Sequence, residues 1–389
     1  MMQTLQLLSA FFLGLGLVYY SIPVIVRISH DKHLFDVPNE RKVNKKIVPN
    51  LGGIALFIGI NLATLLSISN NPFPEFRFIL SGMIILFFIG IKDDILIISA
   101  HKKFTAQILS ALILIILGDI RFTNLHGILG FHEISYVFSV IFSLLAVVAI
   151  INAQNLIDGI DGLAASVGIL AAILFGSAFF LADQTNYAIL CAATAGSLIS
   201  FFIYNVYGKK NKIFMGDTGS LILGLLLSVL VIQYNEFSIS AGDLLFNFSP
   251  VFSLAILAIP VFDMIRIFSF RIYRRKSPFS PDMNHIHHKY LQSGLSHRKI
   301  NLILITANLF IIGIVFIFRT INNNLLLLLL VTMVSLLMLF PRFLHSTKTA
   351  ENKFDIHGYL LPTKKRIGSK VTVRENATFI RTPTEITSL

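Results

Sequence analysis

The stretch that decides the fold is SYVFSVIFSLLAVVAIINAQNLIDGIDGLAASVGILAAILFGSAFFLA, residues 135–182. Its apolar residues run to Ile151 and resume at Leu163, and about 20 mostly apolar residues, or fewer in a tight bundle, cross a bilayer core. Because a chain in lipid must satisfy its own backbone hydrogen bonds, both runs are predicted to be transmembrane helices. The polar turn between them contains two carboxylates three positions apart, Asp158 and Asp161.

The composition of the whole chain agrees with an integral membrane protein. Of its 389 residues, 55% are hydrophobic and 13% are charged, and the mean hydropathy is +0.77, whereas soluble domains carry about 25% charged residues. The single cysteine, Cys191, excludes a disulfide within one chain and is expected to be an apolar packing residue. The net charge of +12 is explained by membrane orientation and anionic headgroups. No nucleic-acid partner is therefore expected.

Similar apolar runs recur along the chain and predict an all-α polytopic bundle of about eleven transmembrane helices. The ten-residue alternation typical of a membrane β-barrel is missing from the sequence. Residues 1–341 are expected to form this bundle, and residues 342–389 a polar, basic, partly disordered tail. The expected spans are 4–26, 51–69, 76–91, 104–118, 135–151, 163–182, 186–206, 218–234, 250–270, 300–318 and 323–341.

Lys and Arg residues are distributed unevenly between successive connections, and this fixes the expected orientation. Every second connection is rich in Lys and Arg, whereas the connections that alternate with these hold only Arg77, Arg121 and Arg319. By the positive-inside rule, the N-terminus lies outside and the tail lies in the cytoplasm. An alternative has ten spans, with the last two apolar runs paired as a hairpin on the inside. The basic connections 27–50, 92–103, 207–217 and 271–299 hold six, three, three and seven Lys or Arg residues, and the tail from residue 342 holds nine.

Four polar motifs fall on the basic side, although Lys and Arg alone assigned the orientation. Each motif alone is weak, because a carboxylate at a span end can be a solvated boundary residue or a helix cap, and a histidine-rich loop can simply be solvated. Together they indicate a site, because ionisable groups at membrane depth are costly and tend to be functional. The motifs are GIKDDILIIS with Asp93 and Asp94, NLIDGIDG with Asp158 and Asp161, IFMGDTGS with Asp217, and DMNHIHHKY with His285, His287 and His288.

Five carboxylates beneath one bundle would repel one another unless a cation lies among them. A divalent metal with few oxygen ligands fits, because Mg²⁺ completes its shell with water or substrate phosphate; zinc fits less well because the loops lack cysteine. An acid-held metal ringed by Lys and Arg is typical of phosphoryl transfer, although much of this basic charge could serve orientation alone. The basic loops are ERKVNKKIVPNLGG, with Arg41, Lys42, Lys45 and Lys46, and AHKKFTAQ, with Lys102 and Lys103.

The motifs KDD, NAQNLIDGIDGLA, FMGDTGS and HIHH, in this order within about residues 30–300, resemble the polyprenyl-phosphate N-acetylhexosamine-1-phosphate transferases. HIHH and the run PNERKVNKKIVPNLGG are similar to the WecA/TagO branch, the undecaprenyl-phosphate GlcNAc-1-phosphate transferases. The MraY branch, which transfers phospho-MurNAc-pentapeptide, typically has three consecutive histidines and ten spans, and it remains the alternative. Asn44 departs from the histidine usual in the RKVHK run of the WecA/TagO branch.

The resemblance implies transfer of a sugar 1-phosphate from a UDP-N-acetylhexosamine, most commonly UDP-GlcNAc, to undecaprenyl phosphate with release of UMP. QuiNAc and FucNAc donors stay open, as does the glycan made, such as O antigen or teichoic acid. The resemblance further implies Mg²⁺ as the cofactor, with Mn²⁺ as a substitute. It also implies a multi-pass protein of the bacterial inner membrane whose active site faces the cytoplasm. A homodimer is possible.

The motif matches also imply roles for individual residues. Asp217 and Asp94 are expected to hold the metal. Asp93 is expected beside the lipid phosphate, and Asp161 near the uracil. The expected catalytic residues are Asp93, Asp94, Asp158, Asp161, His285, His287 and His288, and the expected substrate-binding residues are Arg41, Lys42, Lys103, Asn155, Gly159, Asn205, Phe214 and Arg274.

Three other classes of membrane protein are less consistent with the sequence. A transporter would show internal repeats and polar residues within its spans, but no repeat is evident and the spans read as nearly free of charge. An intramembrane metalloprotease would need a helical HExxH or similar motif, which the sequence lacks. A structural scaffold would not explain four acidic or histidine motifs on one side.

Overall fold

The computed structural model describes residues 2–34, 48–68, 72–96, 98–241, 249–275 and 285–346. Within these residues the chain is a helical bundle with one short β-hairpin, and the bundle forms one compact unit up to His345. The helices are α1 (Met2–Asp31), α2 (Gly52–Ser67), α3 (Phe76–Leu96), α4 (Ala100–Leu112), α5 (Tyr136–Ile157), α6 (Leu163–Leu181), α7 (Thr185–Phe202), α8 (Gly216–Ala241), α9 (Ser249–Ile256), α10 (Ala258–Tyr273), α11 (Ile286–Gln292), α12 (His297–Ile317) and α13 (Asn323–Ser346); π-helical turns η1 (Ile113–Leu117) and η2 (Ile203–Tyr207) extend α4 and α7, and the hairpin pairs β1 (Asn124–Ile128) with β2 (Phe131–Glu133).

The expected all-α polytopic membrane fold is confirmed. Among the described residues, eight helices are long and apolar enough to cross a membrane, and the bent pair α9–α10 brings this to nine. The two other expected spans are also helical: α2 is a shorter apolar helix of 16 residues, and α3 has 21 residues and carries Lys92, Asp93 and Asp94 near its end. The tail expected from residue 342 begins within α13, which continues to Ser346, and residues 347–389 lie outside the described part.

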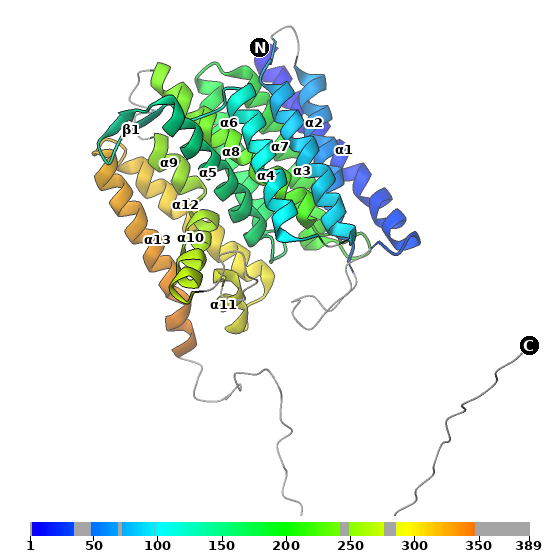
Figure 1. Cartoon of the computed structure of the whole chain (residues 1–389). Coiled ribbons are helices and arrows are strands. Elements are labelled where there is room, and N and C mark those ends of the chain that lie inside the picture. The colour runs from blue at the N-terminus through cyan, green and yellow to red at the C-terminus, as the bar shows by residue number, and fades with distance from the viewer. Residues whose placement is uncertain are drawn as a thin grey trace, which may run out of the picture. The chain divides into compact units, whose positions relative to one another are not determined.

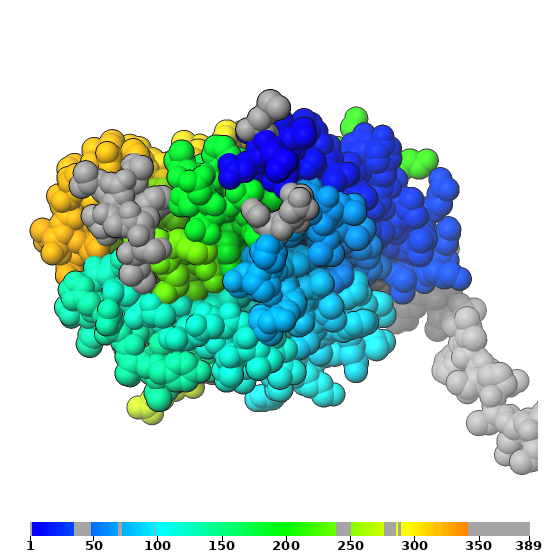
Figure 2. Space-filling model, turned by 90° about the horizontal axis from the view of Figure 1, so that it is seen from above, coloured from blue at the N-terminus to red at the C-terminus, as the bar shows by residue number. Residues whose placement is uncertain are grey.

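α8 is the central helix of the bundle, and five other helices pack directly against it among the described residues. The apolar window of α8 is 89% buried, whereas those of α1 and α13 are only 28% and 22% buried. α8 packs against α2, α3, α5, α6 and α9, so its leucine-rich sequence is apolar all round, as a fully surrounded helix requires. Figure 2 shows α1 (dark blue) and the C-terminal helices (yellow to orange) at opposite edges of the bundle.

The two ends of the bundle differ in character. Figure 1 shows the N-terminus and the β-hairpin at one end, and α11 with the C-terminal ends of α1 and α10 at the other. The hairpin was not expected from the sequence, because strands of five and three residues are too short to show a periodic pattern. Glu236, near the end of α8, holds it by accepting hydrogen bonds from the Thr123 N–H (2.7 Å) and hydroxyl (2.6 Å).

The expected single span 250–270 is wrong in detail, because α9 and α10 meet at an angle of 84°. Pro260 explains the break: it has no N–H to donate to the carbonyl of Ile256, four residues earlier, and its ring crowds that carbonyl. The buried Asn308 of α12 donates to the Ile256 carbonyl instead, at 3.0 Å. A backbone acceptor freed inside the bundle is thus satisfied by a side chain of another helix.

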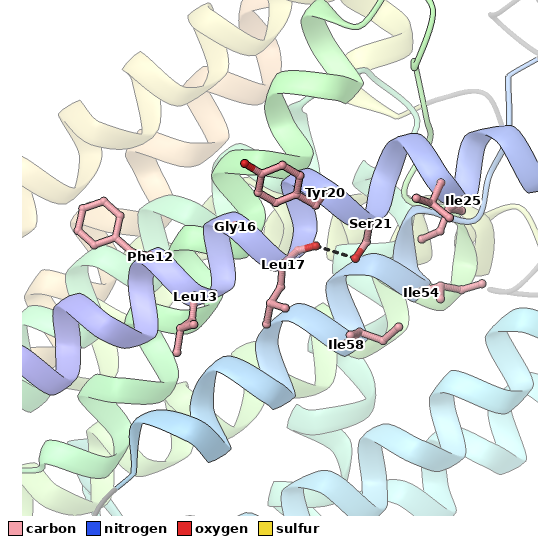
Figure 3. A pocket seen from close by; sticks show the side chains of 10 residues that line it. Phe12, Leu13, Gly16, Leu17, Tyr20, Ser21, Ile25, Ile54 and Ile58 are labelled. Carbon is pink, nitrogen blue, oxygen red and sulfur yellow. Dashed lines mark hydrogen bonds between the residues drawn. The ribbon is translucent and has the colours of Figure 1, made fainter.

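An apolar surface groove of about 540 Å³ lies between α1 and α2. Figure 3 shows Leu13 and Leu17 of α1 facing Ile54 and Ile58 of α2, with the Ser21 hydroxyl donating within α1 to the Leu17 carbonyl at 2.6 Å. None of the residues that line this groove was expected in the functional site. The polar chemistry lies elsewhere, at the end of the bundle where the acidic motifs meet.

Replacement of Asn308 by alanine tests the helix break. Asn308→Ala leaves the Ile256 carbonyl buried without its donor, so we expect a loss of about 1–3 kcal/mol of stability, measured as a lower thermal midpoint in detergent. The control is Thr332→Ala, which removes an exposed hydroxyl that bonds within α13 to Leu328 and should change stability by less than about 0.5 kcal/mol. Equal midpoints for the two variants would contradict this account of the break.

Candidate active site

The ends of α3 and α8 meet through the carboxylate of Asp94. This side chain accepts the N–H of Asp217 (2.8 Å) and both the N–H (3.1 Å) and the hydroxyl (2.6 Å) of Thr218. These are among the first N–H groups of α8, which have no partner inside the helix and carry the positive end of its dipole. Asp94 therefore caps α8 from a neighbouring helix. Asn50, just before α2, donates to the backbone carbonyl of Asp94 at 3.1 Å.

Two glycines permit this close approach. Gly216 has a φ of +71°, and a Cβ at this position would lie 2.0 Å from the carbonyl oxygen of Asn50 and 2.7 Å from the carboxylate of Asp94. At Gly90, one turn before Asp94, a Cβ would lie 2.4 Å from the Cα of Thr218. Only glycine allows both the left-handed backbone and this helix contact, which explains the glycine that precedes Asp217 in the FMGDTGS motif.

Lys103 joins the carboxylates of two different helices. Its ammonium group lies 2.6 Å from Asp93 of α3 and 2.8 Å from Asp217 of α8. Asp93 also accepts the N–H of Ile98 at 2.7 Å, which fixes its orientation. The side chain of Asp217 is 30% exposed and that of Asp93 only 8%, so Asp217 is the carboxylate with more access to an incoming ligand.

The NLIDGIDG motif forms the turn between α5 and α6, and it lies next to these acids. Burial raises the pKa of Asp158 well above its usual value, and the negative charges of Asp217, Asp94 and Asp161 raise it further. Asn155, one turn earlier, accepts the Ser220 hydroxyl at 2.8 Å and so ties the end of α5 to the start of α8. The turn therefore adds to the same acidic cluster.

Asp161 points to a second set of partners. Its carboxylate lies 2.6 Å from Lys212 and 3.3 Å from Nδ1 of His297, the first residue of α12. Burial alone would raise the pKa of Asp161, but the hydrogen bonds and positive charge of these two partners outweigh it and lower the pKa. The ammonium group of Lys212 also lies 5.6 Å from the ring centre of Phe214, within cation–π range.

Asn205 holds two loops of the site together. Its Oδ1 accepts the N–H of Gly162 at 2.6 Å, and its Nδ2 donates to the carbonyl of Ile213 at 2.8 Å. Gly162 has a φ of +83° and directly precedes α6. The amide of Asn205 thus connects the acidic turn to the segment that leads into Phe214.

Of the remaining expected residues, some lie near the site and others lie outside the described part of the chain. His285 is buried against Asp263 of α10, with 3.1 Å between Nδ1 and the carboxylate. His287 and His288 lie in α11, but their side chains are outside the described part, as are Arg41 and Lys42 in residues 35–47. Gly159 is exposed on the acidic turn, and Arg274 is exposed at the end of α10, where its guanidinium lies 4.2 Å from the centre of the Phe270 ring.

The sequence reading missed Asp263, Lys212 and His297. Asp263 could have been predicted, because it is a carboxylate inside an apolar run and such residues usually have a function. It was missed because the spans were expected to be nearly free of charge. Lys212 was counted only as a topological charge, and His297 lies in a polar loop where nothing distinguishes it. Their contacts with Asp161 depend on the fold.

The donor set suits a hard divalent cation with few protein ligands. In the described residues, no group of three or more His, Cys, Asp or Glu side chains is arranged to hold a metal by itself. Mg²⁺ does not require such a group, because it is usually held by one or two carboxylates with water and phosphate oxygens. Asp217 fits a direct contact, whereas the oxygens of Asp94 already accept hydrogen bonds from the start of α8.

Thr218→Val tests the cap that joins α3 to α8. The substitution removes the hydroxyl that donates to the half-buried Asp94, so we expect a loss of about 1–3 kcal/mol, read as a lower thermal midpoint. Thr194→Val is the matched control, because this buried hydroxyl donates only to the Leu190 carbonyl of its own helix. If the two variants unfold at the same temperature, the cap contributes nothing beyond an ordinary helical threonine.

Comparison with known proteins places the chain in a family. Residues 76–235, which include Asp93, Asp94, Asp158, Asp161 and Asp217, match the model of glycosyl transferase family 4. The chain is 30% identical over 315 residues to the undecaprenyl-phosphate alpha-N-acetylglucosaminyl 1-phosphate transferase of Yersinia pestis, covering 80% of this chain and 83% of the relative. It is 32% identical over 269 residues to the protein of the same name from Shigella flexneri, covering 68% and 71%.

A relative from a third bacterium is equally similar. The chain is 32% identical over 315 residues to the probable undecaprenyl-phosphate N-acetylglucosaminyl 1-phosphate transferase of Bacillus subtilis strain 168, covering 80% of this chain and 83% of the relative. These matches extend over most of the bundle and confirm the family expected from the four motifs. The chain belongs to glycosyl transferase family 4 and lies among the relatives of the undecaprenyl-phosphate N-acetylglucosaminyl 1-phosphate transferases.

Proposed function

We propose that this protein transfers N-acetylglucosamine 1-phosphate from UDP-GlcNAc to undecaprenyl phosphate and releases UMP. The observation that carries the proposal is the cluster in which Lys103 joins Asp93 to Asp217 while Asp94 caps α8. The names of relatives from three bacteria, at 30–32% identity, support the same reaction. Donor and acceptor are both anions that repel each other, and a divalent cation held by these carboxylates, together with Lys103, would neutralise that charge.

The reaction exchanges one phosphorus–oxygen bond for another. An oxygen of the acceptor phosphate bonds to the phosphorus that carries the sugar, and the bond from that phosphorus to the UMP oxygen breaks. Because the second pKa of a phosphate monoester is about 6, the attacking oxygen is largely ionised near neutral pH and needs no strong base. The protein's contribution is therefore positioning and charge neutralisation.

The residues of the cluster divide this work. The Lys103 ammonium lies between Asp93 and Asp217 and supplies positive charge where the phosphates meet. Asp93, held by the Ile98 N–H, orients Lys103 beside the acceptor phosphate. Asp217 would hold Mg²⁺ or Mn²⁺, and the metal would neutralise charge on the pyrophosphate. Asp94 fixes the backbone of Asp217 by accepting its N–H.

The other end of the donor would lie at the turn around Asp161. Lys212 and His297 fix this carboxylate as an acceptor, and an ionised carboxylate can accept the N–H of a base such as uracil. The Phe214 ring lies beside Lys212 and offers an aromatic surface. Asn205 maintains the spacing between the two segments. These contacts support a nucleotide at this side of the cluster.

Transfer is tested directly with membranes that contain the protein, radiolabelled UDP-GlcNAc, undecaprenyl phosphate and Mg²⁺. We expect label in the organic phase, and EDTA should abolish it. Asp217→Asn should lower transfer about 100-fold or more, with normal amounts of protein in the membrane, because the amide would hold the metal less well and the metal would neutralise charge in the transition state. Asp119→Asn is the control, since this carboxylate is 75% exposed and pairs only with Arg121 in the described residues.

The outcomes separate the parts of this proposal. No label from UDP-GlcNAc, but label from another UDP-N-acetylhexosamine in a donor panel, would change the sugar and keep the reaction. No label from any donor would overturn the reaction itself. Full activity of Asp217→Asn would remove its role as metal ligand.

The proposed acceptor also requires that the acidic end of the bundle face the cytoplasm, in a bacterial inner membrane. The only cysteine, Cys191, is buried, so a Cys191→Ser background allows single cysteines to report orientation. Leu129→Cys, in the exposed turn of the hairpin, should react with an impermeant maleimide added to intact spheroplasts. Lys102→Cys, exposed beside the site, should react only after permeabilisation. The reverse pattern would invert the orientation.

A further inference from the structure

A carboxylate in the expected ninth span joins the histidine motif to the bundle. Asp263 lies one turn into α10 and is 1% exposed. Its Oδ2 lies 3.1 Å from Nδ1 of His285, and its Oδ1 accepts the N–H of Ile286, the first residue of α11, at 3.1 Å. In this contact, the Asp263 clamp, one buried side chain fixes both the first histidine of HIHH and the start of the helix that carries the other two.

The charge of Asp263 is balanced on its own helix. Arg266, three residues later, lies 2.5 Å from Oδ1 through Nη2 and 3.2 Å through Nε. A buried carboxylate is costly unless it is paired and hydrogen-bonded. With Arg266 on one side and His285 and Ile286 on the other, Asp263 meets both conditions, so it can remain charged within the fold.

The bond through Nδ1 also fixes the imidazole of His285. When Nδ1 donates to a carboxylate, the ring cannot rotate freely, and Nε2 is held on the opposite side in a defined tautomer. In metal sites and catalytic triads, partners of this kind orient a histidine without touching the substrate. The same arrangement here links a residue of the HIHH motif to a rigid helix.

α10 lies between the helix that ends at the acidic turn and the segment that carries the histidines. Pro260 turns α10 by 84° away from α9, and α10 then packs against α5, the helix that ends at the acidic turn. α11, which follows the clamp, packs against α12, whose first residue is His297 beside Asp161. Asp263 therefore connects the histidine segment to the same end of the bundle as the acidic cluster.

We propose that Asp263 is a positioning residue that holds His285 and the start of α11 in the orientation needed for transfer. It does not touch the substrate and acts through His285. This inference rests on the proposed function, because it assigns His285 a part in the same reaction. It concerns a different element, since Asp263 belongs neither to the cluster around Lys103 nor to the partners of Asp161 in the described residues.

A double-mutant cycle tests the proposal on purified full-length protein. Asp263→Asn should lower kcat about 10–100-fold, the usual cost of losing an orienting partner, and should change KM for UDP-GlcNAc much less. His285→Gln should cause a similar loss. The double variant should be no worse than either single variant, because Asp263 acts only through His285. Losses that multiply in the double variant would overturn the proposal.

Stability provides a second readout. A purely structural role would lower the thermal midpoint of Asp263→Asn while leaving kcat of the folded fraction unchanged, and that result would also overturn the proposal. If Asp263→Asn fails to accumulate in the membrane, Asp263→Glu keeps the charge but moves the carboxylate by one methylene. We expect this variant to accumulate and to lose kcat about 10-fold or more; full activity would contradict a positioning role.

The controls separate this inference from the proposed function. Asp119→Asn makes the same chemical change in an exposed Asp–Arg pair and should retain wild-type kcat. If the wild-type protein transfers no sugar phosphate from any donor, the proposed function fails and not the clamp alone. If the wild type is active and Asp263→Asn has wild-type kcat, the clamp fails and the function stands.

Discussion

The structure depends on one carboxylate placed at the start of a buried helix. α8 is enclosed by other helices, and the first N–H groups of its backbone have no partner within the helix. Asp94 supplies the missing acceptors from α3, and two glycines bring the backbones close enough for it to do so. The cap and the site are therefore one arrangement, because the residue after Gly216 is Asp217 itself.

Several like charges are gathered at this end of the bundle, and each is balanced in a different way. Asp93 and Asp217 share the ammonium group of Lys103, while Asp161 is paired with Lys212 and His297. Asp94 is satisfied by the N–H groups and hydroxyl at the start of α8. The pKa of Asp158 is raised by burial first and by the neighbouring acids second. A site with this many carboxylates attracts cations. Anionic substrates can approach the carboxylates only when bound cations neutralise their charge.

Much of this could be predicted from the sequence, because lipid imposes simple rules. Apolar runs located the helical segments of all the expected spans, although the span 250–270 is divided into α9 and α10. The spacing of Lys and Arg grouped the four acidic or histidine motifs before any contact was known. The structure brings Asp93, Asp94 and Asp217 together as that grouping requires. Local sequence is enough here, since hydropathy and motif spacing are properties of short segments.

What could not be predicted depends on contacts between distant segments. The break before Pro260 is stable because Asn308, 52 residues from Ile256, replaces the lost helical donor. The partners of Asp161 come from the loop before α8 and from α12. The β-hairpin is held by Glu236 and is too short to show a period. No window of sequence contains both members of these pairs.

The hairpin contact has a further mechanical consequence. α8 is fastened at both ends: Asp94 grips its first turn, and Glu236 near its last turn is tied to Thr123. Sliding α8 along its axis by a single residue, about 1.5 Å, would break both attachments at once. The central helix is thus held at both ends, so its position along its own axis is fixed relative to α3 and to the β-hairpin.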